Sequence, residues 1–218
     1  MSGDSTGFLY PFLAGAAFDE GALLDDLAAS ARAKRTTSGA LLAATLDDAA
    51  SDIDAAAEAL AAAARTGGRA LVAGNGGSAA DAAGFAALLR QPPWGVAMGA
   101  LCLAEDPTIL TALANDVGVG LVFARQTAAH GGPGDVLVAL STSGRSENIV
   151  KALAAARRAG MVTIAVTGEG GRDLRADGAA DHVVVVSSDS VHRVQETQEA
   201  VLFEVWARAQ LRIEEVQR

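Results

Sequence analysis

The chain has 218 residues, 50% of them hydrophobic and 20% charged, so it can bury a sizeable core and does not have the composition of a disordered protein. Its 17 Lys and Arg against 26 Asp and Glu leave a net charge of −9, which repels phosphate backbones and anionic membranes, and we expect neither nucleic acid nor membrane as a partner. The single cysteine excludes an internal disulfide and a cysteine-based metal cluster. No apolar run reaches the roughly 20 residues that a membrane helix needs, and a cytoplasmic location is expected.

The first part of the chain is predicted to be helical. Apolar residues recur every three or four positions from Leu42 to Ala64, as on the buried side of an amphipathic helix, and two glycines then end the pattern. A shorter helical pattern precedes it, and the segment 36–39 between them leaves a break or a kink open. We therefore expect an N-terminal helical or extended segment, residues 1–40, followed by one domain, residues 41–218.

Short continuous apolar runs begin after residue 68 and alternate with helical patterns. Strands are expected at 69–73, 95–103, 135–140, 162–166 and 182–186, and helices at about 79–90, 109–129, 147–159 and from 191 onward. Strands that are apolar at every position are typical of a sheet covered on both faces. Strands that alternate with helices are typical of a parallel sheet, whose ligands bind beyond the carboxyl ends of its strands. The predicted fold class is therefore α/β.

Three glycines follow the first predicted strand, in the run Gly74-Asn-Gly-Gly-Ser78 that opens a helix. Glycines let the backbone approach a ligand, and the free N–H groups of a helix start attract an anion, so we interpret this glycine loop as a ligand loop. Its spacing also fits a dinucleotide fingerprint, which expects an acidic residue about 20 positions later. Trp94 stands there instead, which disfavours a dinucleotide. Asp81 is interpreted as a first-turn acid stabilised by the helix dipole.

A second loop carries four hydroxyl side chains within six residues, in the run Ser141-Thr-Ser-Gly-Arg-Ser146. This serine loop again lies between an apolar strand and a helix, where several hydroxyl donors can surround the oxygens of one phosphate. Ser146 is also placed to cap the following helix, which would explain its hydroxyl without a ligand. No Lys follows the glycine, as a nucleotide-triphosphate loop requires, so a phosphomonoester is the expected ligand.

The final predicted helix divides into two faces. Its apolar face carries Val191, Val194, Val201, Leu202, Val205 and Ala209. Its polar face carries His192, Gln195, Glu196 and Glu199, at the spacing i, i+3, i+4 and i+7. This polar face either lines a pocket or is a solvated surface, and the spacing does not decide between them.

The glycine loop, Ala114-Asn115-Asp116, the serine loop and Gln195-Glu196 together resemble, in this order, the signatures of sugar isomerase (SIS) domain proteins, and most of all their phosphoheptose isomerase branch. The resemblance implies a five-stranded parallel sheet flanked by helices in a flavodoxin-like three-layer sandwich. It also implies a cytoplasmic homotetramer that acts on sedoheptulose 7-phosphate in carbohydrate metabolism. Taken alone, Asn115-Asp116 is equally well explained as a turn. The implied contacts to the sugar phosphate are Asn75, Gly76, Gly77, Ser78, Asn115, Asp116, Ser141, Thr142, Ser143, Ser146 and Gln195.

The resemblance also implies a zinc ion, which in the isomerases is held by His and Glu on the helix after the glycine loop and by Gln and His on the final helix. The corresponding residues here are Gly84, Leu88, Gln195 and Phe203. Three of these four side chains cannot coordinate a metal, so we expect no metal and no other cofactor.

Aldose–ketose isomerisation still needs a base beside the carbonyl group and an acid to return a proton. His192, Glu196 and Glu199 are the available candidates on the polar face, although a surface role for His192 is the more common one. The sequence thus predicts a sugar-phosphate isomerase of the phosphoheptose type that lacks the usual zinc site. The alternative is a non-catalytic sugar-phosphate sensor or tetrameric adaptor protein.

Overall fold

The computed structural model describes residues 20–217, in a chain that divides into two compact units, Met1–Thr37 and Ser38–Arg218. Helix α1 (Glu20–Asp48) begins in the first unit and is not broken at the segment 36–39, where a break or a kink was left open. The hydroxyls of Thr36 and Thr37 donate to backbone carbonyls one turn earlier, at 3.2 and 2.9 Å. This back-bonding lets both residues lie inside the helix.

The second unit alternates strands and helices, as expected. Its elements after α1 are α2 (Ala50–Arg65), β1 (Ala70–Ala73), α3 (Gly77–Arg90), β2 (Ala100–Cys102), α4 (Pro107–Val117), the 3-10 turn η2 (Val119–Leu121), α5 (Val122–His130), β3 (Val136–Ser141), α6 (Glu147–Arg158), β4 (Val162–Thr167), α7 (Gly171–Ala176), β5 (His182–Val185) and α8 (Val191–Gln217).

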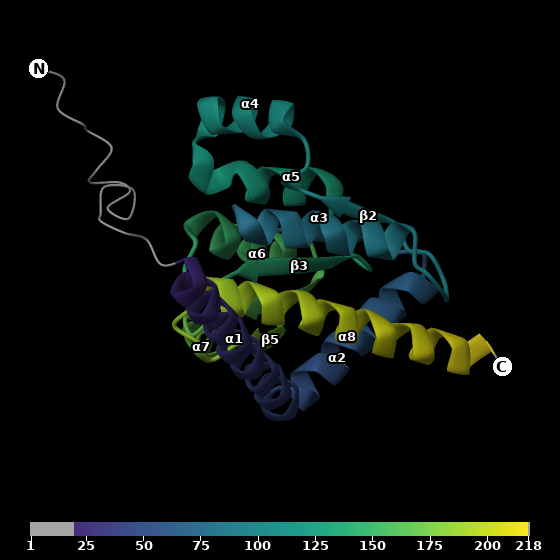
Figure 1. Ribbon diagram of the computed structural model, residues 1–218. Coiled ribbons are helices and arrows are strands. Elements are labelled where there is room, and N and C mark those ends of the chain that lie inside the picture. The colour runs from purple at the N-terminus through teal and green to yellow at the C-terminus, as the bar shows by residue number, and fades with distance from the viewer. Residues whose placement is uncertain (1–19, 218) are drawn as a thin grey trace, which may run out of the picture. The chain divides into compact units, whose positions relative to one another are not determined.

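The five strands form one parallel sheet in the order β2-β1-β3-β4-β5. Alternate strand residues face opposite sides, and both sides are covered. Val72 and Val138 pack in one core with α2, α3 and α8, whereas Leu71 and Leu137 pack in a second core with α5 and α6. Figure 1 shows α3 and α8 running past the sheet in the same general direction. The structure therefore confirms the predicted five-stranded α/β sandwich and its covered faces.

The predicted elements differ from the observed ones at several points. The expected helix 42–64 is interrupted at Ala49, and the expected helix 109–129 ends at Gly118, whose φ of 85° favours glycine. The expected strand 95–103 shortens to β2, and α7 was not predicted. On α8, Val191 is 53% exposed, so it does not belong to the apolar face, whose other predicted members are buried.

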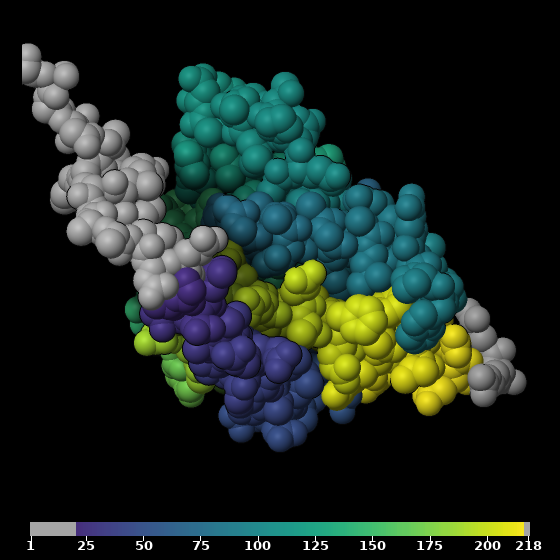
Figure 2. Space-filling model, in the orientation of Figure 1, coloured from purple at the N-terminus to yellow at the C-terminus, as the bar shows by residue number. Residues whose placement is uncertain are grey.

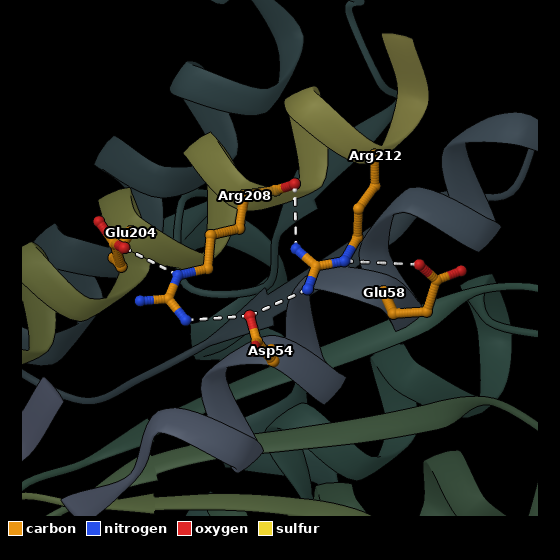
Figure 3. A network of polar contacts seen from close by, with 5 residues as sticks. All are labelled: Asp54, Glu58, Glu204, Arg208 and Arg212. Atoms are coloured by element: carbon orange, nitrogen blue, oxygen red, sulfur yellow. Dashed lines mark hydrogen bonds and ion pairs between the residues drawn. The ribbon is translucent and has the colours of Figure 1, made fainter. Parts of the chain in front are cut away.

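Charged side chains join α2 to α8 on the surface of the second unit (Figure 3). Asp54 accepts hydrogen bonds from Arg208 and Arg212, both at 2.9 Å, and Arg208 also pairs with Glu204 at 2.8 Å. The hydrogen bonds from Arg212 and then Arg208 hold the pKa of the Asp54 carboxyl below its ordinary value. Such exposed pairs orient the helices more than they stabilise them.

Cys102 is 3% exposed at the end of β2, and this burial raises the pKa of its thiol. Within residues 20–217, no helix taken singly has the length and apolar character needed to cross a membrane. One bent pair, Pro107–Val117 with Val119–His130, meets that test only when both helices are counted together.

Candidate functional site

The glycine loop and the serine loop lie at neighbouring strand ends. Strands β1 and β3 are paired, with Ala73 opposite Ala139, so the two loops leave the sheet side by side at its carboxyl edge. From β1 the chain crosses to β2 on one side, whereas β3 is followed by β4 and β5 on the other. The two loops therefore flank the switch point of the sheet, where open α/β sheets bind their ligands.

A pair of amide side chains ties the two loops together. Asn75 in the glycine loop and Asn148 in the first turn of α6 exchange two hydrogen bonds, each 2.9 Å long. Asn148 is 6% exposed and was not singled out in the sequence, because nothing in its neighbourhood marks it as a partner of a residue 73 positions away. The pair fixes the distance between the glycine loop and the start of α6.

The end of α8 nearest the sheet edge completes this arrangement. A Cβ atom at Gly77 would overlap the side-chain amide of Gln195, so that amide lies directly against the glycine loop. Gly76, the residue before α3, has a φ of 56°, a conformation that favours glycine. The structure thus brings the glycine loop and Gln195 together, and their contacts with a sugar phosphate stay a prediction. It also shows that these glycines serve the geometry of the loop itself.

The hydroxyl groups of the serine loop form a cluster. Ser141, which is 3% exposed, lies 3.1 Å from the Ser146 hydroxyl and 3.4 Å from the Ser143 hydroxyl, measured between Oγ atoms. The Ser141 Oγ also accepts from the Gly144 amide at 3.1 Å. Ser146 occupies the N-cap position of α6, but its hydroxyl makes no capping bond. The capping explanation of Ser146 is therefore wrong for its side chain, which points into the cluster.

Helices α3 and α6 begin without a side-chain cap, as α2, α5 and α7 also do. Helix α4 shows the usual alternative, because Asp106 accepts from the amides of Thr108 and Ile109 at 2.8 and 3.3 Å. The first N–H groups of α3 and α6 are thus left for another acceptor, and both helix starts carry partial positive charge. Two uncapped helix starts beside a hydroxyl cluster suit an anion such as a phosphate group.

A third loop, which was not predicted from the sequence, packs against the backbone of the serine loop. It follows β4 and is rich in glycine, in the run Gly168-Glu-Gly-Gly171. A Cβ atom at Gly168 would overlap the carbonyl oxygen of Thr142, and one at Gly170 would overlap that of Ser143. These close approaches hold the backbone of the serine loop in place, and the three glycines were the signal that could have found them.

The other residues predicted to contact the sugar phosphate are either buried, as Ser78 is, or lie on the exposed end of α4, as Asn115 and Asp116 do. Ser78 is 3% exposed, and its hydroxyl lies 3.5 Å from the side-chain oxygen of Gln198 on α8. Asn115 and Asp116 occupy the exposed last turn of α4, where the Asn115 amide donates to the Asp116 carboxylate at 3.0 Å. The turn that was considered for these two residues is therefore a helix end. Their contact with a ligand stays a prediction.

One turn beyond the loops, α3 and α8 enclose a cavity of about 840 Å³ with the adjoining part of α1. Figure 2 shows the face on which α3, in blue, and α8, in yellow, lie next to each other. Glu196 and Glu199 line the cavity, whereas His192 is exposed at the start of α8 and is not among the lining residues. Ser38 donates to Glu196 at 2.7 Å. The large apolar lining residues are Leu42, Leu46, Phe85, Leu88, Leu202 and Phe203.

This cavity contains the three positions that differ from the zinc ligands of the isomerases. Gly84, Leu88 and Phe203 all line it, and a Cβ atom at Gly84 would meet nothing within 4 Å. Apolar carbon therefore stands where metal donors would be needed, so these residues do not fit a zinc ion. Within the described range 20–217, no group of three or more His, Cys, Asp or Glu side chains is placed to hold a metal ion.

Asp81 also lines the cavity, and its interpretation as a first-turn acid is wrong. Helix α3 has no acidic residue in its first turn, because it begins at Gly77 and Asp81 lies in the second turn. Burial, and then the charge of Glu199, raise the pKa of the Asp81 carboxyl above its ordinary value of 3.8. The Asp81 Oδ2 atom is buried and has no hydrogen-bond partner among the described residues.

Comparison with known proteins places this chain in one family. A family model described as SIS domain matches residues 35–168, which is more than half of the chain. The chain therefore belongs to the SIS domain family.

Its relatives include phosphoheptose isomerases. The one from Akkermansia muciniphila is 47% identical over 126 residues, which cover 57% of this chain and 66% of the relative. The chain spans less than two thirds of the length of the first curated relatives that it matches, at 66, 57 and 66%.

Solved structures of phosphoheptose isomerases resemble this chain over more of its length than the curated relatives do. The phosphoheptose isomerase from Neisseria gonorrhoeae is 33% identical with a TM-score of 0.74, and the match covers 84% of this chain and 97% of that one. The one from Francisella tularensis is 29% identical with a TM-score of 0.77, covering 86 and 98%. The sugar isomerase domain of a transcription factor from Sphaerobacter thermophilus is 25% identical with a TM-score of 0.55, covering 84 and 95%.

Proposed function

We propose that this chain binds a phosphorylated sugar at the switch point of its sheet and interconverts the aldose and ketose forms of that sugar without a bound zinc ion. Sedoheptulose 7-phosphate is the first substrate to test, because the relatives reported above are named phosphoheptose isomerases. A homotetramer in the cytoplasm is part of the same proposal and rests on the resemblance alone.

One observation carries the proposal for the phosphate. Two uncapped helix starts and the hydroxyl cluster of Ser141, Ser143 and Ser146 lie at adjacent strand ends. Neutral hydroxyl and amide donors, together with two helix dipoles, bind a dianion without a buried cationic side chain. The amide of Gln195 beside Gly77 offers hydrogen bonds to the sugar next to its phosphate.

The absence of zinc ligands shapes the proposed chemistry. Gly84, Leu88 and Phe203 supply neither a Lewis acid nor a proton carrier, so proton transfer falls to the carboxyl groups that line the same cavity. Of the three residues predicted as proton carriers, Glu196 and Glu199 line the cavity. Glu196 accepts a hydrogen bond from the Ser38 hydroxyl, so Glu199 is the more available base.

Turnover after metal removal tests this function. The purified chain is dialysed against EDTA and incubated with sedoheptulose 7-phosphate, and the interconversion of ketose and aldose is followed by NMR. We expect turnover that EDTA does not abolish and that added zinc does not increase. Turnover that requires added zinc would contradict the proposal of a metal-free isomerase.

The second candidate is a sugar-phosphate sensor or adaptor without catalysis. The apolar residues at positions 84, 88 and 203 favour it, because the same loops would bind the ligand while the reaction chemistry is lost. A related fold in a transcription factor, described as its sugar isomerase domain, is compatible with such a role. Tight binding of the sugar phosphate with no turnover at high protein concentration would support this candidate.

A further inference from the structure

Helices α3 and α8 leave the ligand loops in the same general direction (Figure 1), and both line the cavity. Gly77 on α3 faces Gln195 on α8, and four residues further along each helix stand Asp81 and Glu199. Four residues advance a helix by about 6 Å, which is less than the extended length of a heptose phosphate. A sugar bound by its phosphate at the loops would therefore reach these two carboxyl groups.

The environments of the two carboxyl groups differ. The Glu199 side chain is exposed at the cavity, whereas the Oδ2 atom of Asp81 is buried with no hydrogen-bond partner among the described residues. A buried carboxyl oxygen without a partner is costly for the fold, so it calls for an explanation other than stability. Burial and the nearby Glu199 also favour the protonated form of Asp81 by raising its pKa. Two carboxyl groups that face each other across one cavity in such different environments are suited to act as an acid and a base.

We propose that Asp81 and Glu199 form the acid–base pair of the isomerisation, with Asp81 as the acid and Glu199 as the base. This inference rests on the proposed function and extends it by naming a residue, Asp81, for which the sequence reasoning preferred a helix-dipole role. It assigns to the cavity a polyhydroxy aldehyde or ketone whose carbonyl end lies between the two helices.

The protons balance without a metal or another reactant. The Glu199 carboxylate removes the proton from C2 of the aldose while the Asp81 carboxyl gives its proton to the oxygen on C1, which forms an enediol. Asp81 then takes the proton from the oxygen on C2, and Glu199 returns its proton to C1. One carbon-bound proton and one oxygen-bound proton have moved, the ketose is formed, and both carboxyl groups regain their starting states.

The test uses the full chain and three variants, Asp81→Asn, Glu199→Gln and the control Glu215→Gln. Glu215 is an exposed residue of α8, 16 positions or about 24 Å along the helix from Glu199, so its variant makes the same charge change away from the cavity. Turnover of sedoheptulose 7-phosphate, exchange of its carbon-bound proton in D₂O, the dissociation constant and the melting temperature are measured for each.

We expect Asp81→Asn and Glu199→Gln each to lose about 100-fold or more in turnover and proton exchange, with dissociation constants within about threefold of the parent. The control should retain full activity, and Asp81→Asn should melt no lower than the parent chain. Full activity in both cavity variants would overturn the acid–base pair while the proposed function stands. An activity loss in Asp81→Asn that follows a lower melting temperature would also overturn it, because it would show a structural role. An inactive parent chain that binds the sugar phosphate would instead contradict the isomerase proposal itself.

Discussion

Replacing Ser146 by alanine separates a ligand-binding hydroxyl from a helix cap. The residue occupies the N-cap position of α6, where a capping serine contributes about 1 kcal/mol to stability. In this structure, however, its hydroxyl makes no capping bond and lies 3.1 Å from the Ser141 hydroxyl in the cluster. The two roles therefore predict different results for the same variant.

The expected size of the effect follows from the ligand. A hydrogen bond from a neutral hydroxyl to a charged phosphate contributes about 1.5–3 kcal/mol, which corresponds to a roughly 10- to 150-fold weaker dissociation constant when it is lost. Loss of a real cap would cost about 1 kcal/mol, or about 2–4 °C in melting temperature for a chain of this size. We expect the first effect in Ser146→Ala and less than about 1 °C of the second.

Calorimetric titration with sedoheptulose 7-phosphate measures the binding, and thermal unfolding of the ligand-free chain measures the stability. Ser143→Ala is the companion variant, and it should weaken binding by a similar factor because its hydroxyl lies in the same cluster. A Ser146→Ala chain that binds the sugar phosphate like the parent but melts several degrees lower would refute the reasoning, since its hydroxyl would then serve the helix.

Three further results are expected. Asp181→Asn should destabilise the chain by about 1 kcal/mol at pH 7. Burial acts to raise the pKa of Asp181, but the hydrogen bonds from Thr163 outweigh it and lower the pKa, so this contribution is present above the ordinary value of 3.8 and should disappear as the pH falls below it. Asp81→Asn should have the opposite sign. Because the pKa of Asp81 is raised, the parent chain loses stability as the pH rises above 3.8, and the variant should melt about 1–3 °C higher at pH 7 but equally at pH 3, as thermal unfolding against pH will show. Finally, the triple variant with His, Glu and His at the cavity positions 84, 88 and 203 should retain about one zinc ion per chain after dialysis; a metal-free product would show that these positions do not converge with Gln195.

The sheet and its loops could be predicted from the sequence because their signals are local. Continuous apolar strands such as Val136–Ser141 are typical of a sheet covered on both faces. The motifs of the glycine loop and the serine loop each lie within a few consecutive residues. Helix α7 was missed because six residues are too few to show a helical period. The break at Gly118 lies inside an apolar pattern and depends on a positive φ that the pattern does not reveal.

The cavity could not be predicted, because it depends on how two distant helices align. Asp81 and Glu199 are 118 positions apart, and neither the spacing on α3 nor that on α8 shows that they share one cavity. The Asn75–Asn148 pair was missed for the same reason. The interpretation of Asp81 as a first-turn acid has a local cause, because α3 begins two residues earlier than the expected 79.

The most direct test of the central claim compares the dissociation constants of sedoheptulose 7-phosphate and unphosphorylated sedoheptulose for the parent chain. If the uncapped starts of α3 and α6 and the hydroxyls between them hold a phosphate, several charge-assisted hydrogen bonds are lost with it. We predict at least about 100-fold tighter binding of the phosphorylated sugar. Equal affinity for the two sugars would contradict the account.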